Sequence, residues 1–241
     1  MKRIIDLILS ISALLTLSPL LLIVLALVWS QDYKNPFYLA PRVAKGGDIF
    51  TMFKVRSMVF NADKNNVGST KLDDPRITRI GRFVRKFKID ELGQLINVIK
   101  GEMSLVGPRP QIKRDVDLYS IKENILLNVH PGITDFASIV FSDEGKILEG
   151  ANDPDLKYNQ VIRPWKSRLG ILYVENRSIL LDIKLILLTI LVIFSRAKAL
   201  SQIQKILKKI SSDDELISVA SRKKPLYPHP PPGLDKIVTS R

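Results

Sequence analysis

The most constraining feature of the sequence is an uncharged apolar run near its start. From Leu7 to Ser30 no residue carries a charge, and leucine and isoleucine dominate. About 20 consecutive apolar residues form a helix that can cross a bilayer. The run is too long for the apolar part of a secretory signal peptide, and no convincing small-x-small cleavage site follows it. The sequence therefore predicts a helix that enters a membrane.

Two details favour a helix that enters the membrane and turns back. Pro19 lies in the middle of the run, and an internal proline removes a helix hydrogen bond and kinks or breaks the helix. Both flanks are basic, and positive residues stay on the cytoplasmic side of a membrane. These flanking residues are Lys2, Arg3, Lys34, Arg42 and Lys45. We interpret residues 1–30 as a re-entrant helix, with a kinked transmembrane span as the alternative.

The charge balance of the chain points to an anionic partner. Lysine and arginine number 37 against 24 aspartate and glutamate residues, which gives a formal net charge of +13. Nucleic acid, a phospholipid surface and a phosphorylated substrate all fit this excess. The absence of cysteine excludes disulfides and thiolate metal sites.

The periodicity of the remaining chain predicts a mainly helical fold with little sheet. Residues 49–55 are typical of a strand, whereas residues 90–100 and 112–129 are typical of helices. Residues 179–194 are apolar but contain two charges, which favours a helix along the membrane surface or packed on the core. The predicted fold class is α/β, mostly helical with a small sheet, plus the re-entrant helix and membrane-surface amphipathic helices.

Changes in composition predict three parts. They are the membrane helix 1–30, a folded domain 31–200 and a C-terminal extension 201–241. The extension is predicted to be largely disordered from about residue 211, because prolines crowd its second half.

Several short motifs occur in a fixed order along the chain. The central block is Asp90-Glu91-Leu92-x-Gln94-Leu95-x-Asn97-Val98, followed by Gly101-x-Met103-Ser104-Leu105-Val106-Gly107-Pro108-Arg109-Pro110. The flanking motifs include Lys54-x-Arg56-Ser57-Met58, Asp74-x-Arg76-x-Thr78-x-x-Gly81 and an arginine at Arg85, and later Pro131-Gly132-Ile133-Thr134 and Tyr173-Val174-x-Asn176-x-Ser178. By these motifs residues 1–195 resemble the bacterial monotopic phosphoglycosyl transferases, which are polyprenyl-phosphate sugar-1-phosphate transferases.

The resemblance implies a two-step transfer at a membrane. The carboxylate of Asp90 would attack the sugar-bearing phosphorus of a nucleotide sugar, usually a uridine diphosphate (UDP) sugar. Uridine monophosphate (UMP) would leave, and undecaprenyl phosphate would then take the sugar phosphate from the enzyme. This reaction starts a surface glycan such as lipopolysaccharide O-antigen, capsule or exopolysaccharide. The resemblance also implies the bacterial inner (cytoplasmic) membrane as the location, with domain 31–200 facing the cytosol.

Each residue type suits this chemistry. Carboxylates are competent covalent nucleophiles, and a free aspartate with a pKa of about 3.9 is ionised at neutral pH. An anion that attacks a diphosphate needs positive charge nearby, which Mg²⁺ and arginine donors supply. The family's pattern assigns the metal to Glu91. We predict phosphate contacts for the basic residues of the matched motifs, namely Lys54, Arg56, Arg85 and Arg109.

The two acids also have a purely structural interpretation. Asp90 is placed to be the N-cap of the 90–100 helix, and Glu91 lies in its first turn. The surrounding motif favours catalysis. We interpret Gln94, Asn97 and Ser104 as residues that shape the loop, Asp6 as a cap or interface residue, and His130 as structural.

Departures from the family pattern keep other functions open. Gly93 and Asp135 stand where many members have proline and glycine, and Gly170 stands where many have an aspartate of the active-site pocket. A catalytically inactive membrane scaffold in glycan assembly is therefore the main alternative. A nucleic-acid binder is disfavoured, because the basic cluster at 76–88 comes with no recognised binding motif. An ordinary glycosyltransferase would release a nucleoside diphosphate instead. Self-association and contact with other glycan-assembly enzymes stay open, as does the identity of the sugar.

Overall fold

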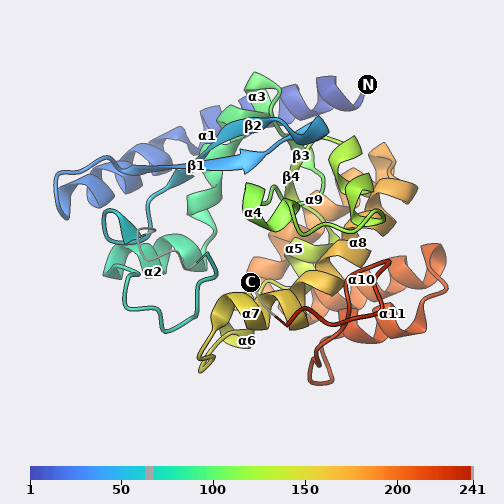
Figure 1. Ribbon diagram of the computed structural model, residues 1–241. Coiled ribbons are helices and arrows are strands. Elements are labelled where there is room, and N and C mark those ends of the chain that lie inside the picture. Colours follow the sequence, from blue (N-terminus) through green and yellow to red (C-terminus); the bar gives the residue numbers. More distant parts are fainter. Residues whose placement is uncertain (63–67, 240–241) are drawn as a thin grey trace.

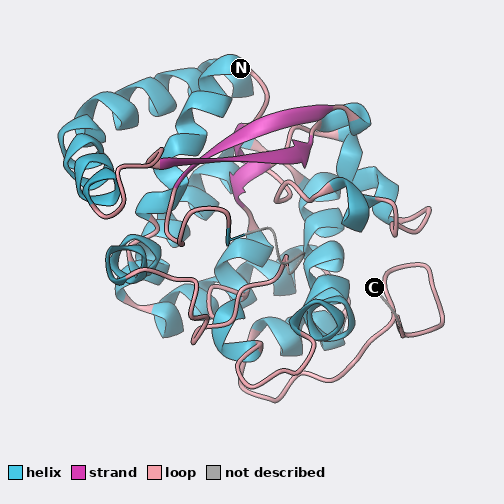
Figure 2. Ribbon diagram, turned by 60° about the vertical axis from the view of Figure 1, so that its left-hand side comes forward, coloured by secondary structure: helices cyan, strands magenta, loops and turns pink. Residues whose placement is uncertain are grey.

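The computed structural model describes residues 1–62 and 68–239, and these form a mainly helical fold with two small sheets. Figure 2 shows the strands gathered on one side, with helices around them. The helices are α1 (Lys2–Ser30), α2 (Arg79–Lys86), α3 (Gln94–Lys100), α4 (Lys113–Val116), α5 (Phe136–Val140), α6 (Glu144–Ile147), α7 (Pro154–Lys157), α8 (Arg163–Asn176), α9 (Ile179–Phe194), α10 (Arg196–Ile210) and α11 (Asp214–Ala220). The strands are β1 (Phe37–Val43), β2 (Ile49–Val55), β3 (Ser104–Val106) and β4 (Gly132–Thr134). The predicted fold class is confirmed.

Helix α1 is long and apolar enough to cross a membrane, and it lies along one edge of the molecule (Figure 1). At its first turn, Arg3 donates to the carbonyls of Val98 and Ile99 at the end of α3, at 2.5 and 2.9 Å. At its last turn, Arg56 reaches the carbonyl of Val28 at 3.5 Å. The middle of the helix, residues 11–20, has no buried side chain. Both ends of α1 are therefore bonded to one body, and the part between them is exposed.

Asp6 fixes the N-terminal half of α1 to the centre of the fold. Its carboxylate accepts hydrogen bonds from the Ser104 hydroxyl at 2.8 Å and from the Leu105 amide at 3.2 Å, both on β3. Only 5% of the Asp6 surface is exposed, so these bonds are shielded from water. The prediction of an interface role for Asp6 is confirmed.

The four strands of the described residues form two separate two-stranded sheets. Strands β1 and β2 form an antiparallel hairpin, and the short strands β3 and β4 pair in parallel. A Cβ atom on Gly107 would lie 2.4 Å from the His130 carbonyl oxygen, so the two segments can meet only because residue 107 is glycine. Asn97 ties α3 to β2 by accepting from the Phe53 amide and donating to the Thr51 carbonyl. This confirms that Asn97 shapes the structure.

The largest core lies among α5, α8, α9, α10 and α11. Its fully buried side chains include Phe136, Ile162, Leu169, Leu185 and Ile203. Helix α9 confirms the helix expected at residues 179–194, and one of its faces packs on this core. Its opposite face is exposed and apolar, with side chains at Leu180, Ile183, Leu187, Ile190 and Phe194.

Two stretches differ from the sequence expectation. The helix expected at 112–129 is broken into α4 and a separate 3₁₀ helix at Glu123–Asn128. The chain after residue 211, where the sequence predicts disorder, contains α11 and then runs along the folded body. Composition misses α11 because Leu216, Ile217 and Ala220 form a short apolar face among polar neighbours, and that face is buried in the large core.

We predict that Asp6→Ala weakens the attachment of α1. The change leaves the buried Leu105 amide and Ser104 hydroxyl without their acceptor, which costs about 2 kcal/mol. The midpoint of thermal unfolding in detergent should fall by about 4–8 °C. Glu149→Ala, which removes an exposed carboxylate, is the control and should stay near wild type. Equal midpoints for the two variants would contradict the role assigned to Asp6.

Candidate active site

Asp90 and Glu91 lie on a tight 3₁₀ turn, Ile89–Gly93, that leads into α3. Lys88 starts the turn in the left-handed conformation, with φ 56°, and no side chain caps either helical segment. The interpretation of Asp90 as an N-cap is therefore wrong, because the chain enters α3 through a further turn. Because the Asp90 carboxylate makes no capping hydrogen bond, it can interact with other groups.

Each of the two acids faces its own cation. The Lys54 ammonium lies 3.6 Å from an Asp90 carboxylate oxygen. The Arg109 guanidinium lies 2.9 Å from Glu91 Oε1. Lys54 comes from β2, and Arg109 comes from the proline-flanked loop after β3, so segments far apart in sequence converge here.

Burial and charge act differently on the two acids. Burial raises the pKa of Asp90, and Lys54 only partly offsets this. Burial also raises the pKa of Glu91, but Arg109 and the nearby lysines outweigh it and hold that pKa at about 2. Glu91 is thus firmly ionised, whereas Asp90 is a desolvated carboxylate next to an ammonium group. Such separation of two neighbouring acids is common where they have different chemical roles.

Arg85 completes the group of cations around the acids. It lies in the last turn of α2, and Asp90 and Asp74 both act on its pKa, although burial lowers that pKa overall. The Thr78 hydroxyl caps the N-terminus of α2 by accepting from the Gly81 amide at 2.9 Å. The structure therefore brings together five of the predicted site residues, namely Lys54, Arg85, Asp90, Glu91 and Arg109.

The sixth predicted residue, Arg56, has other partners. Its guanidinium is bound by both carboxylate oxygens of Asp32, one at 2.6 Å, and these bonds lower the pKa of Asp32 to about 2. Strand β2 ends at Val55, so the chain leaves the sheet between Lys54 and Arg56. Arg56 consequently reaches the end of α1 rather than the acidic pair, and we assign it to that anchor.

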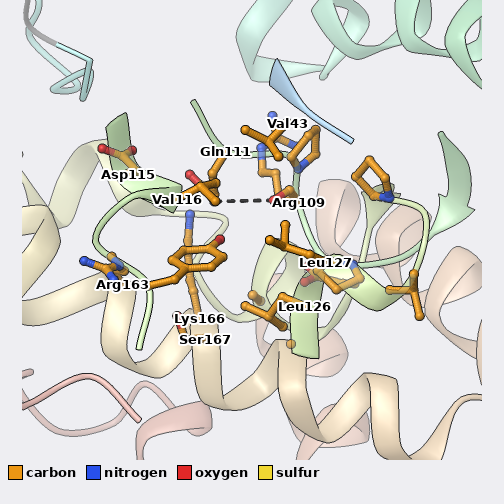
Figure 3. Close-up of a pocket in the computed structure, with 18 of the residues that line it drawn as sticks. Val43, Arg109, Gln111, Asp115, Val116, Leu126, Leu127, Arg163, Lys166 and Ser167 are labelled. Atoms are coloured by element: carbon orange, nitrogen blue, oxygen red, sulfur yellow. Dashed lines mark hydrogen bonds between the residues drawn. The ribbon is translucent and has the colours of Figure 1, made fainter. Parts of the chain in front are cut away.

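A cavity begins at Arg109 and extends toward α8 (Figure 3). Its empty space, including the open mouth, is about 690 Å³. Figure 3 shows Arg109 and Gln111 on one side and Arg163, Lys166 and Ser167 on the other. The α8 residues recur at helical spacing, so they share one face of that helix. The sequence analysis did not identify these three residues as part of a site, although the sequence itself contains this polar stripe at helical spacing.

The α8 wall of the cavity carries two buried cations with assigned partners. Lys166 pairs with Glu144 and lies 5.2 Å from the centre of the Tyr158 ring. Burial lowers the pKa of Lys166, but Glu144 and Tyr158 raise it above its ordinary value. Arg163 lies 3.0 Å from Glu123, a carboxylate with no exposed surface. The wall is therefore polar, and each of its two cations is paired with a carboxylate. Such a wall suits a ligand rich in hydroxyl or amide groups.

Further along α8 the cavity is apolar, where Gly170 meets Leu126. A Cβ atom on Gly170 would lie 2.9 Å from a terminal methyl group of Leu126 and 3.8 Å from Pro108. Leu126 thus fills the space that a side chain at position 170 would need. An aspartate at position 170, which the family pattern leads one to expect, would fit only if the Leu126 side chain moved.

The acidic pair can take part in holding a metal ion but does not form a cage. Among the described residues no group of three or more potential metal ligands occurs. Mg²⁺ commonly takes one or two protein carboxylates and fills its other positions with water and substrate phosphates. Arg109 contacts Glu91 through Oε1, which leaves Oε2 for a cation. The residues therefore fit Mg²⁺ that is shared with a phosphorylated substrate.

Comparison with known proteins gives one consistent result. The family model described as "Bacterial sugar transferase" matches residues 1–196. The exopolysaccharide production protein ExoY of Sinorhizobium fredii is 35% identical over 204 residues, covering 78% of this chain and 83% of the relative. An undecaprenyl-phosphate glucose phosphotransferase of Komagataeibacter xylinus is 41% identical over 197 residues. The undecaprenyl-phosphate galactose phosphotransferase of Salmonella typhimurium is 32% identical over 211 residues. Those two matches cover 78% and 81% of this chain but only 35% and 41% of the relatives.

We predict that the effect of Gly170→Ala reverses sign with the residue at position 126. In the wild-type background the added methyl group meets Leu126, and overpacking should destabilise the protein by about 1 kcal/mol. In a Leu126→Ala background the clash is gone, and alanine should stabilise α8 by about 0.5–1 kcal/mol because it is the better helix former. Unfolding of the four proteins in detergent measures this cycle. The same sign in both backgrounds would show that the two positions are not complementary.

Proposed function

The chain belongs to the bacterial sugar transferase family and is a phosphoglycosyl transferase, and we propose that it transfers a sugar 1-phosphate from a UDP-sugar to undecaprenyl phosphate. The single observation that carries this proposal is the buried pair Asp90–Glu91, in which each acid faces its own cation. Two of the relatives are named for undecaprenyl phosphate as acceptor, and another for exopolysaccharide production. The product would start a surface glycan such as exopolysaccharide, capsule or O-antigen.

We assign the nucleophile to Asp90. A carboxylate oxygen of Asp90 forms a bond to the sugar-bearing phosphorus, and the bond from that phosphorus to the bridging oxygen breaks. UMP leaves with the electron pair on its own phosphate. In the second step an oxygen of undecaprenyl phosphate forms a bond to the same phosphorus, and the bond to Asp90 breaks. The carboxylate is regenerated, and the lipid leaves as a diphosphate-linked sugar.

The surrounding cations make this attack feasible. Lys54 holds the Asp90 carboxylate and reduces its repulsion from the incoming phosphates. Arg85 and Arg109 provide donors for the phosphate oxygens on which charge collects. Glu91 would hold Mg²⁺, which when bound neutralises charge on the diphosphate. Arg109 belongs both to the reacting group and to the lining of the cavity, so we place the donor across the two.

The position of α1 supports action at a membrane surface. We infer re-entry from three features: α1 is one continuous helix with Pro19 inside it, its middle has no buried side chain and would enter the bilayer, and its bonded ends would stay with the body. The exposed apolar face of α9 would lie along the same surface. We place the active site on the cytoplasmic face of the inner membrane, where the nucleotide sugar is made and the excess of basic residues meets anionic lipids.

We predict that Asp90→Asn abolishes turnover. The amide cannot form the phosphorus ester, so UMP release should fall by about 10³-fold or more. The assay offers UDP-glucose, UDP-galactose and UDP-N-acetylgalactosamine with Mg²⁺ and undecaprenyl phosphate, and intact-mass analysis reports the sugar-phosphate adduct on the protein. Asp48→Asn is the control and should behave as wild type. Full activity of Asp90→Asn would remove Asp90 as nucleophile. Absence of UMP release from any donor would favour the scaffold alternative, and release of UDP would indicate an ordinary glycosyltransferase.

We also predict that Pro19 keeps both ends of α1 on one side of the membrane. Because the chain has no cysteine, Ile4→Cys and Asn35→Cys each give a single labelling site. In spheroplasts, an impermeant maleimide should label neither site in the otherwise wild-type chain. Adding Pro19→Leu restores the backbone hydrogen bond that proline removes inside α1, which should favour a full span and expose Ile4→Cys to labelling. Labelling of Ile4→Cys without the proline change would establish a full span and overturn re-entry.

A further inference from the structure

The segment that follows α11 lies against the elements that line the cavity. We call residues 223–239 the C-terminal strap. The strap lies outside residues 1–196, the part matched by the family model. In Figure 1 it runs in red from α11 back across the molecule toward α7. Pro231 and Pro232 are buried, so the strap is packed rather than loosely attached.

Gln160 and Trp165 hold the strap on the side of α8 that faces away from the pocket. The His229 amide donates to the Gln160 carbonyl at 2.9 Å, and the Gln160 side chain donates to the Val238 carbonyl at 2.8 Å. The His229 ring lies 4.5 Å from the Trp165 ring, measured between centroids. Gln160 lies in the π-helical turn just before α8, so these contacts fix the beginning of that helix.

A second contact connects the strap to a buried charge. The Ser120 hydroxyl donates to the Pro232 carbonyl, and the Ser120 amide donates to Glu123 Oε2 at 2.9 Å. Glu123 in turn accepts from Arg163 at 3.0 Å and from the Ser167 hydroxyl at 2.6 Å. Arg163 and Ser167 line the cavity. A continuous series of hydrogen bonds therefore leads from the strap to two pocket residues.

Helix α8 separates the two sides of this arrangement. Arg163, Ser167 and Gly170 recur at i, i+4 and i+7 and line the cavity. Trp165 and Arg168 lie on another face and contact His229 of the strap, with Arg168 at 3.4 Å. A displacement of the strap would thus act on α8 from behind the pocket.

We propose that the C-terminal strap positions the pocket for the nucleotide-sugar donor, with Ser120, Glu123 and His229 as positioning residues. This proposal rests on the proposed function in that the donor occupies the cavity. Glu123 is completely buried, and its carboxylate accepts from the Ser120 amide, so a shift of Ser120 disturbs the acceptor that orients Arg163. Loss of the strap removes the acceptor of the Ser120 hydroxyl, and Arg163 is then less firmly positioned. Donor binding is weakened, whereas the Asp90–Glu91 pair, held by Lys54 and Arg109, keeps its geometry.

Gly233→Ala tests the strap without touching the pocket. Gly233 has φ +81°, and its Cβ would lie 3.0 Å from the Lys122 side chain, so alanine pushes the strap away. Gly150→Ala is the matched control, because Gly150 also has a positive φ but has nothing within 4 Å. His229→Ala and a chain ended after Arg222 remove the strap contacts by other routes. All variants keep every residue of the catalytic group.

Two measurements decide the outcome. Hydrogen–deuterium exchange without substrate should accelerate at residues 120–126 and 163–170 in the three strap variants, and not in Gly150→Ala. Donor KM should rise about tenfold in the same three variants with kcat almost unchanged. Unchanged exchange and unchanged KM in the strap variants would overturn the proposal. An equal fall of kcat in the three strap variants, together with faster exchange throughout the protein, would also overturn it, because it would indicate general unfolding. Because exchange needs no turnover, a wild-type protein inactive with all donors would count against the proposed function alone.

Discussion

The pairing of each buried acid with its own cation is the constraint on which the site depends. Two adjacent carboxylates taken out of water repel each other and favour protonation. Lys54 and Arg109 oppose this, and they arrive from β2 and from the loop after β3. The hairpin, the short parallel sheet and the entry to α3 must therefore all be in place before the acids can be ionised together. Removing one partner of a buried ion pair is strongly destabilising. The packing of these segments and the ionisation of the acids therefore depend on each other.

The same logic explains why α1 is fastened at both ends. Its first turns are bonded to α3 and β3, the elements that follow the acidic pair and precede Arg109. Its last turn is bonded through Arg56, two residues beyond Lys54. Each point of attachment thus lies on a segment that neighbours a proposed site residue in the chain. Under the proposed function, an apolar helix anchored in this way would set the height of the reacting carboxylate relative to the lipid surface, which matters when one substrate is soluble and the other is a membrane lipid.

Sequence reasoning succeeded where a local pattern carries a physical requirement. The apolar run at 7–30, the strand at 49–55 and the group formed by Lys54, Arg85, Asp90, Glu91 and Arg109 could all be predicted. It failed where three-dimensional contacts decide. Arg56 looks like a second phosphate ligand until Asp32 is seen to hold it, and Asp90 looks like an N-cap until the extra turn is seen. The α8 wall, including Arg163 and Lys166, forms a polar stripe in the sequence, but its place in a pocket became clear only once the fold had brought it opposite Arg109.

Under the proposed function, the cavity offers a structural basis for selecting different donors. The reacting group is built from motif residues, whereas the α8 wall depends on pairs that no motif describes, such as Gly170 with Leu126. Glycine at position 170 leaves room for the Leu126 side chain, which makes that corner of the cavity apolar. The buried Glu123–Arg163 pair is connected through Ser120 to Pro232, which lies outside the matched region. Selectivity for the sugar would then change through such pairs and through the extension, while the motif residues proposed to perform the transfer stay the same.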